Sequence, residues 1–132
     1  SEEMSAKIIC EPLRAMMKSL RESLPEDMRV SETAFIGDLD ALEQDALARY
    51  RALLPVSVAF TYRDLSDEEF SRMLDFYGTS AGRNFNSAVL EALVSSLYSA
   101  GEECGKGMAE ILVEARQNAR VDDKGNGEPE KR

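Results

Sequence analysis

The fold class depends on one short stretch, residues 56–62, which reads Val-Ser-Val-Ala-Phe-Thr-Tyr. Its alternation of apolar and polar residues, with branched and aromatic side chains, is typical of a β-strand. The sequence holds no second stretch with which it could pair, however, and a lone strand is not stable. We therefore expect residues 56–62 to form a short buried helix with Pro55 in its first turn, and we predict an all-α protein.

The segment before Pro25 predicts a first helix. Apolar side chains recur every three or four residues from Ile9 to Leu24, and charged residues occupy the other faces. This spacing indicates an amphipathic helix. Because Pro12 cannot donate a backbone hydrogen bond, the helix either begins near Cys10 or kinks there.

A second helix is predicted between a loop at 25–32 and Pro55. Apolar residues again recur at helical spacing over residues 35–54, and either Ser31 or Thr33 is suited to cap the helix. The proline stops this helix or starts the next one. We expect its acidic residues to face solvent: Asp38, Asp40, Glu43 and Asp45.

The second half of the chain predicts further helices. Residues 66–69, Ser-Asp-Glu-Glu, form a capping box that opens a helix closed by Gly78. Thr79 or Ser80 then caps a longer apolar stripe that continues toward Ala119. We expect three glycines to loosen or break this last helix: Gly101, Gly105 and Gly107.

Together these segments predict an irregular antiparallel bundle of about five or six helices in a single domain, residues 1–120. Short loops at 25–32 and 63–66 favour antiparallel neighbours. A chain of 132 residues is expected to bury roughly two thirds of its unfolded surface. Residues 121–132 have almost nothing to bury, so we expect a disordered tail.

The composition argues against several classes of function. The chain carries a net charge of −9, and such a field repels nucleic acid and anionic membrane surfaces. It contains no histidine, which is the usual general base near neutral pH and the commonest metal ligand. An apolar run of about 20 residues is also missing, so we expect no membrane span. The polar opening residues do not resemble a signal peptide, which a mature exported protein would have lost.

No motif in the sequence predicts a cofactor or a metal ion. Residues 101–107 contain glycines and a lysine but have neither the spacing nor the Ser or Thr of a phosphate loop. Residues 122–128 lack the carboxylate pattern of a calcium loop. A hydrolase that works through two carboxylates stays an alternative, although no pair of acidic residues is marked out by the sequence. We therefore expect a protein that is not an enzyme.

The two cysteines, Cys10 and Cys104, allow two interpretations. They are either half-buried structural thiols, or a disulfide that joins the first helix to the last and stabilises the fold by about 4–5 kcal/mol. Gly101 and Gly105, four residues apart, are suited to the close approach of another helix at the level where the two cysteines would meet.

One segment resembles a known protein family. Residues 65–70 read Leu-Ser-Asp-Glu-Glu-Phe, and residues 74–85 read Leu-Asp-Phe-Tyr-Gly-Thr-Ser-Ala-Gly-Arg-Asn-Phe. This pattern resembles a family of uncharacterised bacterial proteins, which are typically exported by Gram-negative bacteria and all-helical. The residues at the motif positions are Phe76, Tyr77, Ala81, Gly82 and Phe85. Their small and aromatic side chains predict a helix hairpin rather than an active site.

The resemblance implies a periplasmic or secreted protein. Members of the family often have a proline where Ser80 stands, and many lack this cysteine pair. The disulfide Cys10–Cys104 therefore does not follow from the family, but an oxidising compartment favours it.

These observations predict a non-enzymatic, exported helical module that binds a partner protein or an envelope component. The alternative is a carrier of a small hydrophobic ligand. The residues expected to line its cavity are Met16, Met17, Phe60, Phe76 and Phe85. Association of the chain into a homodimer through a leftover apolar face is left open by the sequence.

Overall fold

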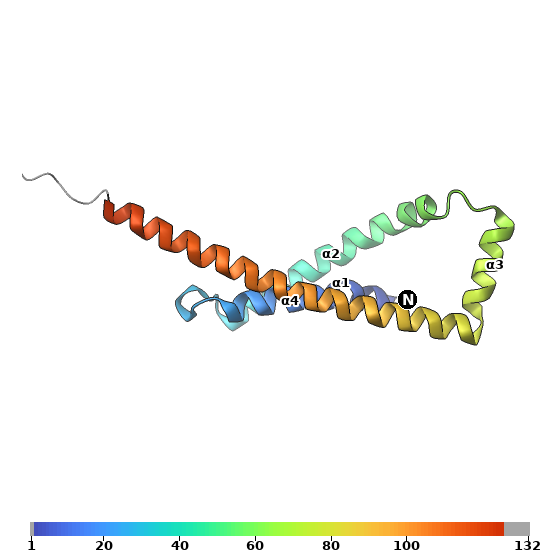
Figure 1. Ribbon diagram of the computed structural model, residues 1–132, viewed down its shortest axis with the longest axis horizontal. Coiled ribbons are helices and arrows are strands. Elements are labelled where there is room, and N and C mark those ends of the chain that lie inside the picture. The colour runs from blue at the N-terminus through green and yellow to red at the C-terminus, as the bar shows by residue number, and fades with distance from the viewer. Residues whose placement is uncertain (1, 126–132) are drawn as a thin grey trace, which may run out of the picture.

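The computed structural model describes residues 2–125, which form four α-helices and one turn of 3-10 helix (Figure 1). The elements are α1 Glu2–Ser23, η1 Glu26–Met28, α2 Glu32–Thr61, α3 Asp67–Gly78 and α4 Ser80–Gly125. No strand occurs among the described residues, so the all-α prediction is confirmed. Residues 56–62 are helical up to Thr61, as predicted, although they belong to the end of a long helix and are exposed rather than buried.

The helices are fewer and longer than predicted because prolines and glycines do not interrupt them. α1 continues through Pro12 and α2 through Pro55, while α4 runs for 46 residues. A proline or a glycine destabilises a helix locally, but the turns on both sides of it remain helical and the helix continues. α4 also includes residues 121–125, which were predicted to belong to a disordered tail. Residues 126–132 of that tail lie outside the described residues.

Capping side chains fix where the helices begin. The Ser31 hydroxyl accepts a hydrogen bond from the backbone nitrogen of Ala34 at 3.2 Å, which selects Ser31 rather than Thr33 as the cap of α2. The capping box of Ser66 and Glu69 is confirmed at the start of α3. Together these bonds satisfy backbone N–H groups that lack a partner inside the helix.

α1 lies along α4, and the two helices run parallel (Figure 1). Pro12 is opposite Gly101, and further along Asp27 bonds to Arg116 at 2.7 Å. The predicted antiparallel bundle is therefore wrong for this pair. It is correct for α1 and α2, which the short loop at 25–32 joins as an antiparallel hairpin.

Small residues let α1 and α4 approach closely. A Cβ placed on Gly105 would lie 2.7 Å from the backbone nitrogen of Leu20 and 2.9 Å from the Cβ of Ser19. One turn later, Ala109 is 1% exposed. At the same contact between α1 and α4, the Ser19 hydroxyl donates a hydrogen bond to the backbone carbonyl of Glu102 at 2.7 Å. The predicted role of Gly101 and Gly105 in close packing is thus confirmed.

The hydrophobic core consists of few residues. The buried apolar residues among those described are Cys10, Ala15 and Ala109, and no large side chain is fully buried. The chain exposes 10,156 Å², so it buries only about half of the surface that an unfolded chain of this mass would expose. The expectation of two thirds is wrong, because α2 and α3 pack against one other helix each rather than into a bundle.

Candidate interaction surfaces

The contact between α1 and α2 is centred on an ion pair that the sequence reasoning missed. Arg14 binds Glu43 through both ends of its guanidinium, Nε to Oε1 and Nη2 to Oε2, the second at 2.9 Å. The Glu43 side chain is 8% exposed, whereas it was expected to face solvent. One signal was present: Glu43 lies between Ile36, Leu39 and Leu47 on one helix face. The hydrogen bond and charge of Glu43 raise the pKa of Arg14.

The predicted disulfide is not formed in the structure. Cys10 is a buried free thiol and Cys104 is an exposed one. The register explains why: Pro12 lies opposite Gly101, so Cys10 sits about 7 Å before the level of Cys104 along the helix pair. Since Cys104 also faces solvent, the two sulfur atoms point to different environments.

Cys10 has a perturbed thiol. Burial raises its pKa, the negative charge of Glu43 raises it further, and the positive charge of Arg14 lowers it. The neutral form of the thiol is therefore favoured in this buried position beside Glu43. This environment is that of a structural thiol and not of a reactive one.

The residues at the predicted motif positions lie at the junction between α3 and α4. A Cβ on Gly82 would lie 2.7 Å from the carbonyl carbon of Phe76, so the two helices meet too closely for a side chain. The backbone nitrogen of Gly82 donates to the Thr79 hydroxyl at 3.0 Å, which selects Thr79 as the cap of α4. The rings of Phe76 and Phe85 are 6.3 Å apart, and Tyr77 stacks at a tilt beside Phe76. Ala81 is exposed at this corner.

The structure does not gather the residues expected to line a carrier cavity. Phe76 and Phe85 contact each other. Met16, however, lies against Gly101, which is about 24 Å further along α4 than Phe85. Met17 shares α1 with Met16, and Phe60 is exposed near the end of α2. Only Phe76 and Phe85 are thus brought together among these five residues, and the five do not line one cavity.

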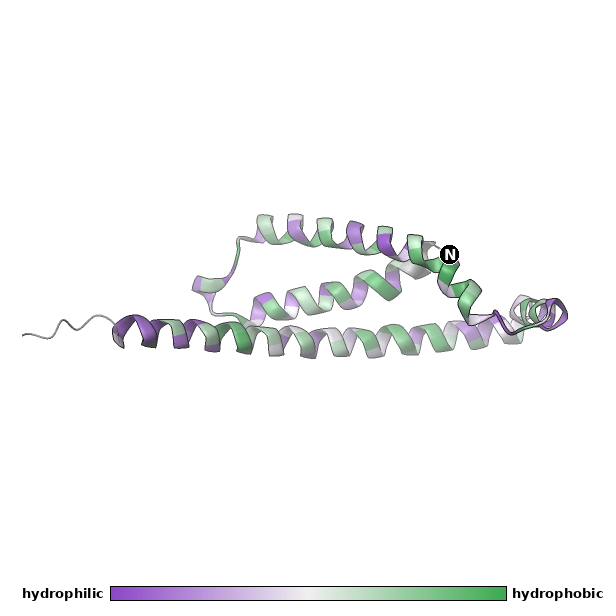
Figure 2. Cartoon of the chain, turned by 90° about the horizontal axis from the view of Figure 1, so that it is seen from above, coloured by the Kyte–Doolittle hydropathy of each residue, from purple (hydrophilic) through white to green (hydrophobic). Residues whose placement is uncertain are grey.

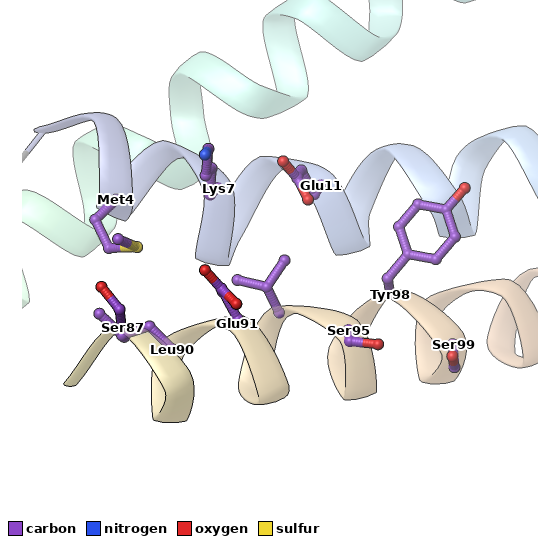
Figure 3. Close-up of a pocket in the computed structure, with 10 residues that line it drawn as sticks. Met4, Lys7, Glu11, Ser87, Leu90, Glu91, Ser95, Tyr98 and Ser99 are labelled. Carbon is purple, nitrogen blue, oxygen red and sulfur yellow. The ribbon is translucent and has the colours of Figure 1, made fainter. Parts of the chain in front are cut away.

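A shallow hollow of about 410 Å³ lies between α1 and the first half of α4 (Figure 3). Met4, Lys7 and Glu11 contribute from α1, and Leu90 and Glu91 are among the residues that contribute from α4. The hollow combines two carboxylates with an amine and several serine hydroxyls. A nucleophile in it has no histidine base, since the chain contains none.

A stripe of exposed apolar side chains follows α2. We call this the α2 stripe, and it consists of Leu42, Leu53, Val56 and Phe60. Its members are separated by 11, 3 and 4 residues, a spacing that places them on one face of a helix. Leu53 is 62% exposed and Phe60 is 66% exposed. Residues 51–61 of α2 are all exposed, and this end of α2 diverges from α1 and α4 (Figure 1).

A second apolar stripe follows α4 on a face that α1 leaves uncovered. We call this the α4 stripe, and it consists of Val89, Leu93, Leu97, Cys104, Met108 and Ile111. All six are exposed, and Ile111 is the most exposed of them at 67%. Hydrophobic residues recur along most of α4 (Figure 2).

Neither a candidate metal site nor a membrane-spanning helix occurs in the described part of the chain, residues 2–125. No cluster of three or more histidine, cysteine, aspartate or glutamate residues among the described side chains could hold a metal ion. No helix in that range combines the length and apolar character needed to cross a membrane. Comparison of the chain with protein-family models, with curated proteins and with solved structures yields no match.

Proposed function

We propose that this protein is a non-enzymatic helical docking module that binds an amphipathic helix of a partner protein along the α2 stripe. The observation that carries the proposal is the exposure of Leu53, Val56 and Phe60 on one unaccompanied face of α2. Apolar patches of this kind, rimmed by charge, mark sites of protein association.

The spacing of the α2 stripe favours a helix as the bound element. Steps of 3 and 4 residues match the seam by which two helices pack with side chains interlocked. Arg49, in the gap between Leu42 and Leu53, forms an ion pair with Asp45 at 2.7 Å. Arg63 lies over the Phe60 ring at 4.0 Å, so these two arginines already have partners within the chain. The partner then needs mainly an apolar face of matching period.

An exported location is part of the proposal, and it rests on the resemblance of residues 65–85 to a family of exported proteins. The acidic charge of −9 is compatible with a protein that acts on another protein and not on an anionic surface. Fractionation of Gram-negative cells that make the natural protein tests this point. Recovery in the periplasm or medium supports export, and recovery in the cytosol contradicts it.

The docking face itself is tested by site-specific photo-crosslinking in those cells. A benzophenone amino acid at Leu53 is expected to give one adduct with a different protein. Phe60→Glu should abolish that adduct because it places a charge in the apolar seam.

Ile36→Glu is the matched control, because Ile36 is on another face of α2 and is also exposed; it should leave the adduct unchanged. Absence of any adduct, or an adduct made only with a second copy of the chain, would refute binding of a foreign helix here.

A further inference from the structure

We infer that a second copy of this chain covers the α4 stripe, in an antiparallel homodimer whose two-fold axis passes near residue 102. This inference concerns a different face from the α2 stripe and does not rest on the proposed function. Four observations carry it: the excess surface of one copy, the lack of charge along the stripe, the symmetry of its side chains, and the charges at its two ends.

The first observation is the area that one copy leaves exposed. A compact monomer of 14.7 kDa exposes about 6,900 Å², whereas this chain exposes 10,156 Å². Residues 1 and 126–132 can contribute at most about 1,300 Å² of the difference. About 1,900 Å² of excess then remains on residues 2–125. Obligate dimers bury about 1,000–2,500 Å² on each subunit, so the excess has the size of one such interface.

The second observation is the chemical character of the stripe. Between Arg83 and Asp122, the charged residues of α4 fall on its other faces. α2 does not reach this side, because it packs on α1 and not on α4. The α4 stripe, an uncharged face of about 33 Å from Val89 to Ile111, is therefore open to a partner. Contact along this face avoids placing like charges opposite each other, which matters for two copies that each carry a net charge of −9.

The third observation is that the stripe is complementary to itself when reversed. A two-fold axis near residue 102 places Leu93 beside Ile111 of the second copy and Leu97 beside Met108 of the second copy. Each pair joins two large exposed side chains, and each occurs twice, as a two-fold interface requires. The same axis puts the two Cys104 residues about one helical turn apart.

The fourth observation is the sign of the charges that bound the stripe. Arg83 precedes it and Asp122 follows it, at nearly equal distances from residue 102. The antiparallel arrangement therefore brings Arg83 of each copy beside Asp122 of the other. A parallel pair would instead place Arg83 beside Arg83, which is repulsive. The bounding charges thus favour the antiparallel arrangement over the parallel one.

Sedimentation equilibrium of the full chain under reducing conditions tests the dimer. The wild type is expected to have twice the monomer mass of 14.7 kDa at micromolar concentration. Leu97→Glu should raise the dissociation constant at least tenfold, because two buried carboxylates would enter one interface. Leu53→Glu is the matched control: Leu53 is even more exposed but lies in the α2 stripe, so its dissociation constant should stay within twofold.

Two further measurements do not depend on an apolar-to-charge change. Crosslinking with a short flexible bismaleimide, which spans the offset of about one turn between the two Cys104 thiols, should give a covalent dimer with wild type and with Cys10→Ser, but none with Cys104→Ser. Arg83→Glu should weaken association about fivefold at low salt, and Arg83→Glu combined with Asp122→Arg should restore it.

A wild type that remains monomeric at 100 µM, or equal effects of Leu97→Glu and Leu53→Glu, would overturn the dimer. Failure of the charge swap to restore association would overturn the antiparallel arrangement. These measurements do not test the α2 stripe. The dimer can therefore be refuted while the proposed docking function stands, and the reverse is also true.

Discussion

At the scale of single residues, the absence of a side chain at Gly105 stabilises the helix pair. Glycine lowers helix propensity by about 1 kcal/mol relative to alanine, yet a methyl group here would meet the backbone of Leu20 at 2.7 Å. Overpacking of this kind costs about 1–3 kcal/mol. The close approach of α1 and α4 therefore outweighs the local preference of the backbone.

Gly105→Ala is accordingly expected to lower the free energy of unfolding by about 1–2 kcal/mol, as measured by urea titration followed by circular dichroism. Gly37→Ala is the control, since a Cβ at Gly37 meets nothing within 4 Å. That variant should gain about 0.5–1 kcal/mol from helix propensity alone. Equal effects of the two substitutions would mean that α1 and α4 are not in close contact.

Cys10 gives a second prediction at this scale, because burial raises the pKa of its thiol and Glu43 raises it further. The pKa of the Cys10 thiol is therefore higher in the folded state than in the unfolded state. At a pH below the unfolded-state pKa, the thiol is neutral in both states and its contribution to stability is fully present. That contribution is lost as the pH rises through the folded pKa. The free energy of unfolding should therefore fall more steeply above neutral pH for wild type than for Cys10→Ala. Cys104→Ser, which changes an exposed thiol, should follow the wild-type curve; if it does not, Cys10 is not the titrating group.

Residue types alone predicted well which glycines lie at close helix contacts. They predicted poorly which side chains form a disulfide or an ion pair. Gly101, Gly105 and Gly82 could be assigned to close contacts from their spacing, because only a missing Cβ permits such an approach. The disulfide could not be assigned, since it depends on the register of two helices distant in sequence. Glu43 was missed because its place on an apolar face indicates burial, whereas its partner Arg14, 29 residues away, follows from the tertiary structure.

At the scale of helices, local signals located the caps of α2 and α3 well and the interruptions of helices badly. Ser31 and Ser66 cap α2 and α3 where the sequence placed a cap. Pro12 and Pro55 were expected to interrupt helices, yet both lie inside continuous ones. Caps act through neighbouring backbone groups, whereas the survival of a helix across a proline depends on the turns and contacts on both sides.

The capping box of α3 gives a prediction for a helix. The backbone N–H of Ser66 and then its hydroxyl donate to Glu69, and these bonds lower the pKa of that carboxyl. The pKa of the Glu69 carboxyl is therefore lower in the folded state than in the unfolded state. The stabilisation by its charge is present above the unfolded-state pKa and is lost as the pH falls through the folded-state pKa. Glu69→Gln should therefore lower the melting temperature at pH 7 and have little effect at pH 2.

Glu68→Gln serves as the control for that measurement. Glu68 is in the same turn but pairs with Arg72 rather than with the cap. Its removal should cost less at neutral pH, because exposed pairs of this type contribute little. A pH-independent loss for Glu69→Gln would show that shape and not charge accounts for the capping contribution.

At the scale of the whole molecule, length and composition gave the wrong expectation for buried surface. A chain of 132 residues has enough apolar residues for one compact core, but much of that apolar area stays on the surface. Periodicity cannot distinguish a face that packs within the chain from one that packs against another molecule, because both carry the same spacing. The α2 stripe and the α4 stripe were therefore read as core.

This arrangement predicts that folding and association are coupled. If a second copy covers the α4 stripe, the dimer is stabilised by mass action, and its melting temperature must rise with protein concentration. Scanning calorimetry of wild type over a hundredfold range of concentration should show this rise. Leu97→Glu should melt at a lower temperature that does not depend on concentration, whereas Leu53→Glu should keep the concentration dependence. A wild-type melting temperature that stays constant would mean that one copy is stable with its apolar face in water, which its thin core makes difficult.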